Sequence, residues 1–256
     1  MCSCIVRELC HYPRYRRTFD RAGQLVVDLR PVTMPLKLLS ATPSPFAQKN
    51  CVAMLKKGIS CAALKRNPPA QKRTSNTKYN PLQRLPILLN PDDPNFGLVH
   101  DPAHIQDYLV TKFASMEPKL LTNDVDIDLK AKKIQISVEG VVVAFVPAFF
   151  ELGREESKRS QGWLEQQNRK VAGGIGTFND LARKRKGECL IVDGREKTIA
   201  DIAVVCAVGH IDFVQTKEGW REEFPELAKW FDVLGYRTDF ASTRPVMVDG
   251  MVGTVV

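Results

Sequence analysis

The sequence has no hydrophobic run long enough to cross a membrane. A spanning helix needs about 18 consecutive apolar residues, whereas the longest run, Val141 to Val146, ends at Pro147. The chain of 256 residues is 44% hydrophobic and 26% charged, which is ordinary for a globular protein. We therefore expect a soluble, cytoplasmic protein without a membrane partner, built from one large domain or two small ones.

The sequence also lacks any recognisable nucleic-acid-binding motif, although its net charge is +8. Basic residues cluster only in the run 183–186, which follows an apolar helical pattern and precedes Gly187. Cations in the last turn of a helix interact favourably with the helix dipole, so the run needs no nucleic-acid ligand. Zinc-finger spacing and aromatic-basic RNA motifs are missing. We expect no nucleic acid among the partners.

A clear secretory peptide is missing too, and the seven cysteines have irregular spacing, which indicates a reducing compartment. Four cysteines stand in apolar sequence and are typical of small core residues: Cys51, Cys61, Cys189 and Cys206. The other three, Cys2, Cys4 and Cys10, have no matching His/Cys half downstream. We therefore expect no metal site.

Residues 1–35 contain no lysine and a single serine, but six arginines and three acidic residues. The acidic residues argue against a mitochondrial transit peptide, and hydrophobic periodicity is weak. We expect a basic, disordered or weakly packed N-terminal extension, with the first domain beginning near Met34.

From residue 36 the pattern alternates between strands and helices. Strands are expected at 36–40, 59–64, 85–90 and 96–99, and helices at 45–57 and from Asp101 onward. This order, βαβ followed by ββα, predicts a small α/β domain over residues 36–113.

Helical periodicity dominates after a polar linker at 114–123. Apolar residues recur at helical spacing through 134–145, so the β-branched run at 141–146 is predicted to be helical. Further helices are expected at 160–184, weakened by three glycines at 173–176, and at 198–213 and 225–234. An all-helical second domain over residues 124–250 follows.

The helix at 198–213 begins with a capping box. Thr198 can cap the first amides, while Asp201 can reach back to the amide of the cap residue. The residues that follow are almost wholly apolar, as in a helix buried on all sides. This helix is predicted to be the core of the second domain, and Asp201 to be structural.

Ser44 stands between two prolines at the junction of a strand and a helix. Because Pro45 suits the first helical position, Ser44 is the expected N-cap. Serines at such positions more often serve only as caps. A hydroxyl there can also donate to an anion such as a thiolate. A second unusual proline, Pro86, lies within an apolar strand, where either a cis bond or an edge strand would explain it.

Taken together, these segments resemble the cytosolic glutathione S-transferase family, in the bacterial and fungal branches with Ser or Cys at the active-site corner. Residues 44–46 are similar to the Ser/Cys-Pro-Phe corner, and residues 80–88 to the Asn-Pro-x-Gly-Lys-Val-Pro-x-Leu segment that contains the cis-proline. Residues 198–203 resemble the capping box of the sixth helix, and residues 224–245 the C-terminal segment. The resemblance covers about residues 36–247 and implies a thioredoxin-like domain followed by an all-helical domain.

The resemblance also implies a glutathione transferase reaction, in which glutathione is the co-substrate and a small electrophile is the acceptor. Ser44 would donate to the glutathione sulfur, Leu85 before Pro86 would pair with its cysteinyl backbone, and the helix start at Asp101 would receive its γ-glutamyl end. The electrophile would lie against the first long helix of the second domain, near Val141, Phe145 and Phe149. A homodimer is the assembly that the resemblance implies.

One position departs from the family pattern. The acid at the γ-glutamyl site is usually followed by Ser, but here Pro102 follows Asp101. Proline removes both a hydroxyl and a backbone amide, each worth about 1.5–3 kcal/mol when bound to a charged group. The departure keeps a second hypothesis open, a non-catalytic, transferase-like protein that binds a partner or ligand without glutathione.

Overall fold

The computed structural model describes residues 16–19, 25–28, 36–41, 44–65, 78–191, 197–214, 217 and 219–245. Within the N-terminal extension it describes two short strands, β1 (Arg16–Phe19) and β2 (Leu25–Asp28), which pair in antiparallel fashion. The rest of the extension, including Cys2, Cys4 and Cys10, lies outside the described residues, so the expectation for it stays a prediction.

The first globular unit is a four-stranded sheet with helices α1 (Pro45–Lys56) and α2 (Pro102–Lys112). Its strands are β3 (Leu36–Ser40), β4 (Cys61–Lys65), β5 (Ile87–Leu89) and β6 (Leu98–His100), in the spatial order β4-β3-β5-β6. The strand pair β3–β4 is parallel and the other two pairs are antiparallel. This is the predicted mixed, thioredoxin-like sheet, with strand ends displaced by one to two residues.

The second unit is entirely helical over the residues that the structure describes. Its longer helices are α3 (Val125–Leu152), α4 (Gln161–Lys184), α5 (Ile199–Val214) and α7 (Pro225–Leu234). Three short helices complete it: η2 (Glu156–Lys158), α6 (Trp220–Glu223) and α8 (Thr238–Ala241). The β-branched run at 141–146 is helical, as predicted, and α3 continues through Pro147.

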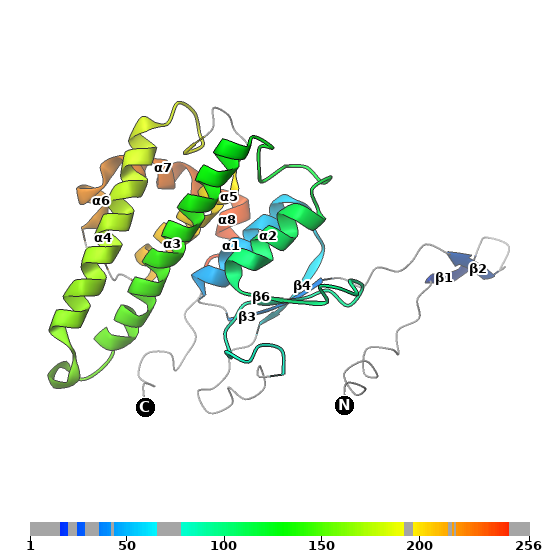
Figure 1. Cartoon of the computed structure of the whole chain (residues 1–256), viewed down its shortest axis with the longest axis horizontal. Coiled ribbons are helices and arrows are strands. Elements are labelled where there is room, and N and C mark those ends of the chain that lie inside the picture. Colours follow the sequence, from blue (N-terminus) through cyan, green and yellow to red (C-terminus); the bar gives the residue numbers. More distant parts are fainter. Residues whose placement is uncertain are drawn as a thin grey trace.

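Helices α3 and α4 lie side by side along most of their length (Figure 1). The glycine run was expected to weaken α4, yet the helix is continuous through it. The structure explains one of these glycines: a Cβ atom at Gly174 would lie 2.1 Å from Cγ2 of Val141. Glycine at 174 therefore lets the two helices approach closely.

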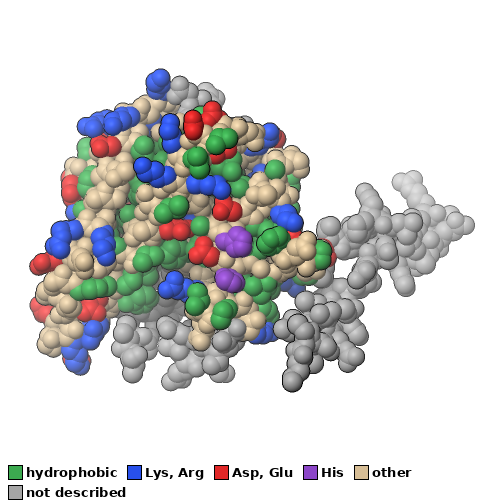
Figure 2. All heavy atoms as spheres, in the orientation of Figure 1, with side chains coloured by type: hydrophobic (Ala, Val, Ile, Leu, Met, Phe, Trp, Pro, Cys, Tyr) green, Lys and Arg blue, Asp and Glu red, His purple; other side chains and the backbone are tan. Residues whose placement is uncertain are grey.

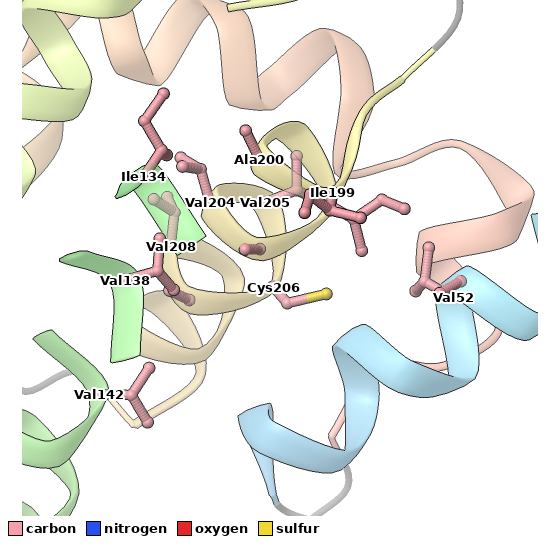
Figure 3. Packing of buried hydrophobic residues seen from close by; sticks show 14 of the residues in the cluster. Val52, Ile134, Val138, Val142, Ile199, Ala200, Val204, Val205, Cys206 and Val208 are labelled. Carbon is pink, nitrogen blue, oxygen red and sulfur yellow. The ribbon is translucent and has the colours of Figure 1, made fainter. Parts of the chain in front are cut away.

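Helix α5 is the central element of the second unit. Every residue from Ile199 to Val208 is buried, and Figure 3 shows Val204 and Val208 among valines of α3, with Val52 of α1 on the other side. Asp201 accepts hydrogen bonds from the amide and hydroxyl of Thr198, at 2.8 and 2.9 Å. This geometry confirms the half of the predicted capping box in which Asp201 reaches back to the amide of Thr198, and it gives Asp201 a structural role.

Helix α3 is long and apolar enough to span a membrane by length and composition. In the structure it packs against α4 and α5, and a row of its apolar side chains is buried there, including Ile134, Val138 and Val142. The core of the helical unit thus takes up one part of its apolar surface, whereas other apolar side chains of α3, such as Ile136 and Val143, are exposed.

On the face shown in Figure 2, basic side chains are spread among acidic and hydrophobic ones. Several of the basic residues pair with acids, as Arg221 does with Asp212 and Asp232. This face does not present a continuous basic surface.

Candidate active site

Ser44 is the N-cap of α1. Its Oγ accepts a hydrogen bond from the amide of Ala47 at 3.3 Å, and its own amide donates to the carbonyl of Ala41 at 3.2 Å. Pro45 occupies the first turn and has no amide to satisfy. Capping uses the serine oxygen as an acceptor, so the hydroxyl hydrogen is still available for a ligand anion near the positive end of the helix.

The loop before β5 contains a cis peptide bond between Leu85 and Pro86. Asn80, only 2% exposed, holds this loop: its Nδ2 donates to the carbonyl of Arg84 at 3.0 Å, and its Oδ1 accepts from the amide of Leu82 at 2.9 Å. The cis form, one of the two sequence interpretations of Pro86, is the one observed. It leaves the backbone of Leu85 at the edge of β5, beside the start of α2.

At the start of α2, Asp101 has a φ of 81°, which is uncommon for a residue other than glycine. Its Oδ1 accepts from the amides of Ala103 and His104, at 2.9 and 3.3 Å. Pro102 contributes no amide. The side chain of Asp101 therefore satisfies the amides that would otherwise be free at this helix end.

Two cavities contain most of the residues predicted for the site. The first, which we call the proline-loop cavity, has a volume of about 140 Å³. Four of the predicted residues line it, together with Phe46, Arg84, His100 and Glu139 among others: Leu85, Pro86, Asp101 and Pro102.

The second, which we call the aromatic cavity, has a volume of about 160 Å³ and is bounded by Ser44, Phe145 and Phe149. Phe46 lines both cavities, so they adjoin at the start of α1. The sequence therefore identified residues that the fold brings together from α1, α3 and the proline loop.

Val141 was predicted near the electrophile, but it lines neither cavity. It is 3% exposed and its side chain lies against Gly174 of α4. Helical spacing places Val141, Phe145 and Phe149 in one row, but the cavity wall begins one turn after Val141, at Phe145. In this structure Val141 lies at the α3–α4 interface, and its predicted contact with the electrophile stays a prediction.

Two further residues of these cavities were missed by the sequence analysis. His210 of α5 lines the aromatic cavity, and Glu139 of α3 lines the proline-loop cavity. Glu139 forms an ion pair with Lys49 of α1, whose side chain is 3% exposed. Desolvation lowers the pKa of Lys49, and the nearby Glu139 carboxylate opposes that shift. A charged residue at helical spacing in a long amphipathic run gives little sign that it faces a cavity.

His210 could have been noticed as a polar residue in an otherwise apolar helix. It is 4% exposed, and burial lowers its pKa to about 4. The ring is therefore neutral near pH 7.

The structure buries, wholly or in part, the four cysteines that were expected to be small core residues. Cys189 and Cys206 are buried, while Cys51 and Cys61 are half-buried. Burial raises the pKa of Cys61 to about 11, which disfavours its thiolate. Among the described residues, no group of three or more His, Cys, Asp or Glu is arranged to hold a metal ion.

Comparison with known proteins places this architecture in a family. Residues 161–233 match the family described as "Glutathione S-transferase, C-terminal domain". The chain is 27% identical over 214 residues to the uncharacterized GST-like protein YibF of Escherichia coli K12, covering 82% of this chain and 98% of that protein.

Solved structures of similar proteins support the same family. A glutathione S-transferase from Methylobacterium radiotolerans, in complex with glutathione sulfonate, is 32% identical, with a TM-score of 0.74 over 84% of this chain and 97% of that one. A glutathione S-transferase from Methylobacillus flagellatus with glutathione bound is 27% identical, with a TM-score of 0.71 over 82% of this chain and 100% of that one. With its thioredoxin-like sheet followed by an all-helical domain, the chain belongs to the glutathione S-transferase family.

Proposed function

We propose that the protein is a glutathione transferase that joins the glutathione sulfur to an electrophilic carbon of a small molecule. The observation that carries this proposal is the position of Ser44. Its hydroxyl borders the aromatic cavity, and its oxygen already accepts from Ala47. The hydroxyl hydrogen is thus free to donate to a thiolate.

Glutathione would lie across the proline-loop cavity. Leu85, before cis-Pro86, would offer its backbone to the cysteinyl part of the tripeptide, and Asp101 marks the γ-glutamyl end. The relatives from Methylobacterium and Methylobacillus have glutathione sulfonate and glutathione bound, which supports this assignment. The electrophile would enter the adjoining aromatic cavity beside Phe145 and Phe149.

In the reaction, the thiol proton of glutathione is lost to solvent and the thiolate attacks the electrophilic carbon. A new S–C bond forms; a leaving group departs with its electron pair, or an addition product takes up a proton from water. The Ser44 hydroxyl and the N-terminus of α1 lower the thiol pKa by stabilising negative charge on sulfur. Residue 44 is not a cysteine, so its side chain cannot form a mixed disulfide with glutathione.

Asp101 and Pro102 favour the second candidate, a transferase-like protein that binds a ligand or partner without glutathione. The amides at the start of α2 are occupied by Asp101 itself, and Pro102 offers no donor. A γ-glutamyl carboxylate would then depend on side chains of the cavity, such as Arg84 and His100.

Titration with glutathione separates the two candidates. We expect calorimetry to detect glutathione binding below millimolar concentration in the wild type and in Ser44→Ala. Conjugation by Ser44→Ala at pH 7 should fall by about 10²-fold, the usual loss when one donor to a developing anion is removed. The defect should shrink at pH 9, where free thiol ionises without help.

Ser160→Ala is a matched control, because Ser160 is also a helix N-cap but is exposed and makes no side-chain capping bond. This variant should keep wild-type activity. Absence of glutathione binding at millimolar concentration would exclude the transferase in favour of the second candidate. Full activity in Ser44→Ala would remove Ser44 from the mechanism.

The setting of the reaction follows from the same proposal. A glutathione-dependent enzyme whose seven cysteines have irregular spacing fits the reducing cytoplasm. We expect a homodimer, as the family resemblance implies, and a role in detoxification or in tailoring a specialised metabolite.

A further inference from the structure

His210 lines the aromatic cavity with an imidazole in an otherwise apolar stretch of α5. Its ring stacks on Phe145, with centroids 5.4 Å apart and planes inclined by 30°, and lies 5.8 Å from the ring of Phe213. Its Nδ1 is buried and has no hydrogen-bond partner among the described residues. Packing against these two aromatic rings therefore holds the imidazole in place.

An unsatisfied buried nitrogen costs free energy, and most native polar groups avoid that cost. Packing alone does not explain it, because an apolar ring could also fill the space between Phe145 and Phe213. Among the described residues, the remaining lining of the cavity is apolar except for the hydroxyl of Ser44: Ala41, Pro45, Phe46, Phe145, Val146, Phe149, Phe150, Phe213 and Val214. Within this described lining, His210 and Ser44 are therefore the side chains that can form hydrogen bonds with a substrate.

We propose that His210 determines which electrophile the cavity accepts, by hydrogen-bonding one hydroxyl group on an uncharged, planar aromatic substrate whose ring packs among Phe145, Phe149 and Phe213. This inference rests on the proposed function, because it names the substrate class of the same site. Apart from His210, the described residues of the lining include no ionisable side chain that could pair with a charged substrate.

The chemistry of the ring supports the choice of a hydroxyl. Burial keeps the imidazole neutral near pH 7, since its pKa is lowered to about 4. A neutral imidazole has one nitrogen that accepts and one that donates, and a hydroxyl can engage either of them.

The volume of the aromatic cavity limits the size of the substrate. An apolar cavity of about 150 Å³ holds a benzene molecule, and the aromatic cavity has about 160 Å³. It therefore accommodates one aromatic ring with a small substituent, and a longer substrate would extend toward Phe46 and the proline-loop cavity.

A matched pair of ligands tests the proposal directly: 4-methylphenol and 1,4-dimethylbenzene have the same shape, but a hydroxyl replaces one methyl. By NMR titration of the full-length protein we expect the phenol to bind about tenfold more tightly, as for one net hydrogen bond. In His210→Phe the order should reverse, because the hydroxyl then loses its water without gaining a partner. His210→Gln, which can still hydrogen-bond, should keep a preference for the phenol.

Phe213→Leu serves as the control, since it alters the ring packed against His210 without removing a hydrogen-bonding group. It should weaken both ligands to a similar extent. Equal binding of the two ligands to the wild type, or no binding of either, would overturn the proposal, and neither outcome depends on a variant that folds. A preference for the phenol that persists in His210→Phe would overturn it as well.

Glutathione titration of the same samples separates this inference from the proposed function. Phenol selectivity without glutathione binding would refute the transferase and leave the role of His210 standing. Glutathione binding without phenol selectivity would do the reverse.

Discussion

Pro102 is the clearest departure of this chain from the family pattern described above. In the structure it leaves the first position of α2 without an amide donor. Replacing it by serine restores a backbone amide and a hydroxyl at the first position of α2. Hydrogen bonds to charged groups contribute about 1.5–3 kcal/mol each, so two restored donors predict that Pro102→Ser binds glutathione at least about 100-fold more tightly in calorimetric titration.

Pro225→Ser provides the matched control, because Pro225 also begins a helix but is exposed on α7. It should leave glutathione affinity unchanged. If Pro102→Ser also binds no better than the wild type, Asp101 and the cavity side chains already supply the γ-glutamyl contacts.

Residues tied to local backbone geometry were readable from the sequence. Ser44 before Pro45 was the expected helix cap, and for Pro86 in an apolar strand the sequence left two interpretations, a cis bond or an edge strand. Residues defined by tertiary packing were not: helical periodicity gave Val141 and Phe145 the same face of α3. Only the position of α4 decides that Val141 meets Gly174 whereas Phe145 faces His210.

Helix α5 depends on a buried acid at its first turn. Asp201 is fully buried, and besides the two bonds from Thr198 it accepts from the amide of Leu190 at 2.8 Å. Its removal leaves buried donors unsatisfied, so we expect Asp201→Ala to lower the free energy of unfolding by about 3 kcal/mol in urea titration. Thr198→Ala, which loses the hydroxyl but keeps both amide bonds, should cost about 1 kcal/mol.

Asp124 gives the comparison, because it caps α3 through the amides of Asp126 and Ile127 but is exposed. Asp124→Ala should cost about 1 kcal/mol, as at ordinary caps. Equal losses at Asp201 and Asp124 would show that burial adds nothing to this cap.

Sequence pattern located the elements better than their ends. The strand expected at 85–90 shortens to Ile87–Leu89, the residues that pair with β3 and β6. The Gly-containing run in α4 was expected to weaken that helix. The helix propensity that these glycines lack is offset by the close approach of Gly174 to Val141 of α3. Because this contact forms only in the folded molecule, the local sequence does not predict it.

At the scale of the whole molecule, two consecutive lysines at the end of α1, Lys56 and Lys57, bind groups that come after the first domain in the sequence. Lys56 forms an ion pair with Asp239 of α8. Lys57 donates to the carbonyls of Met116 and Pro118 in the segment between α2 and α3, at 2.8 and 3.3 Å. The end of α1 opposite Ser44 is thus held by the second unit and by the segment that joins the two units.

The ion pair between Lys49 and Glu139 is the sharpest test of that connection, because it joins α1 to α3 with the ammonium group buried. Glu139→Leu leaves this cation without a counter-charge, which in buried pairs costs about 3 kcal/mol or more. We expect that loss in the free energy of unfolding, measured without glutathione, and a single cooperative transition for both domains.

The double variant Lys49→Met/Glu139→Leu should recover most of the lost stability, because two apolar side chains then replace the pair. Glu155→Gln, at an exposed pair with Lys158, should change stability by less than about 0.5 kcal/mol. A double variant as unstable as Glu139→Leu alone would mean that α1 and α3 are held by packing, with no part played by the charge of Lys49.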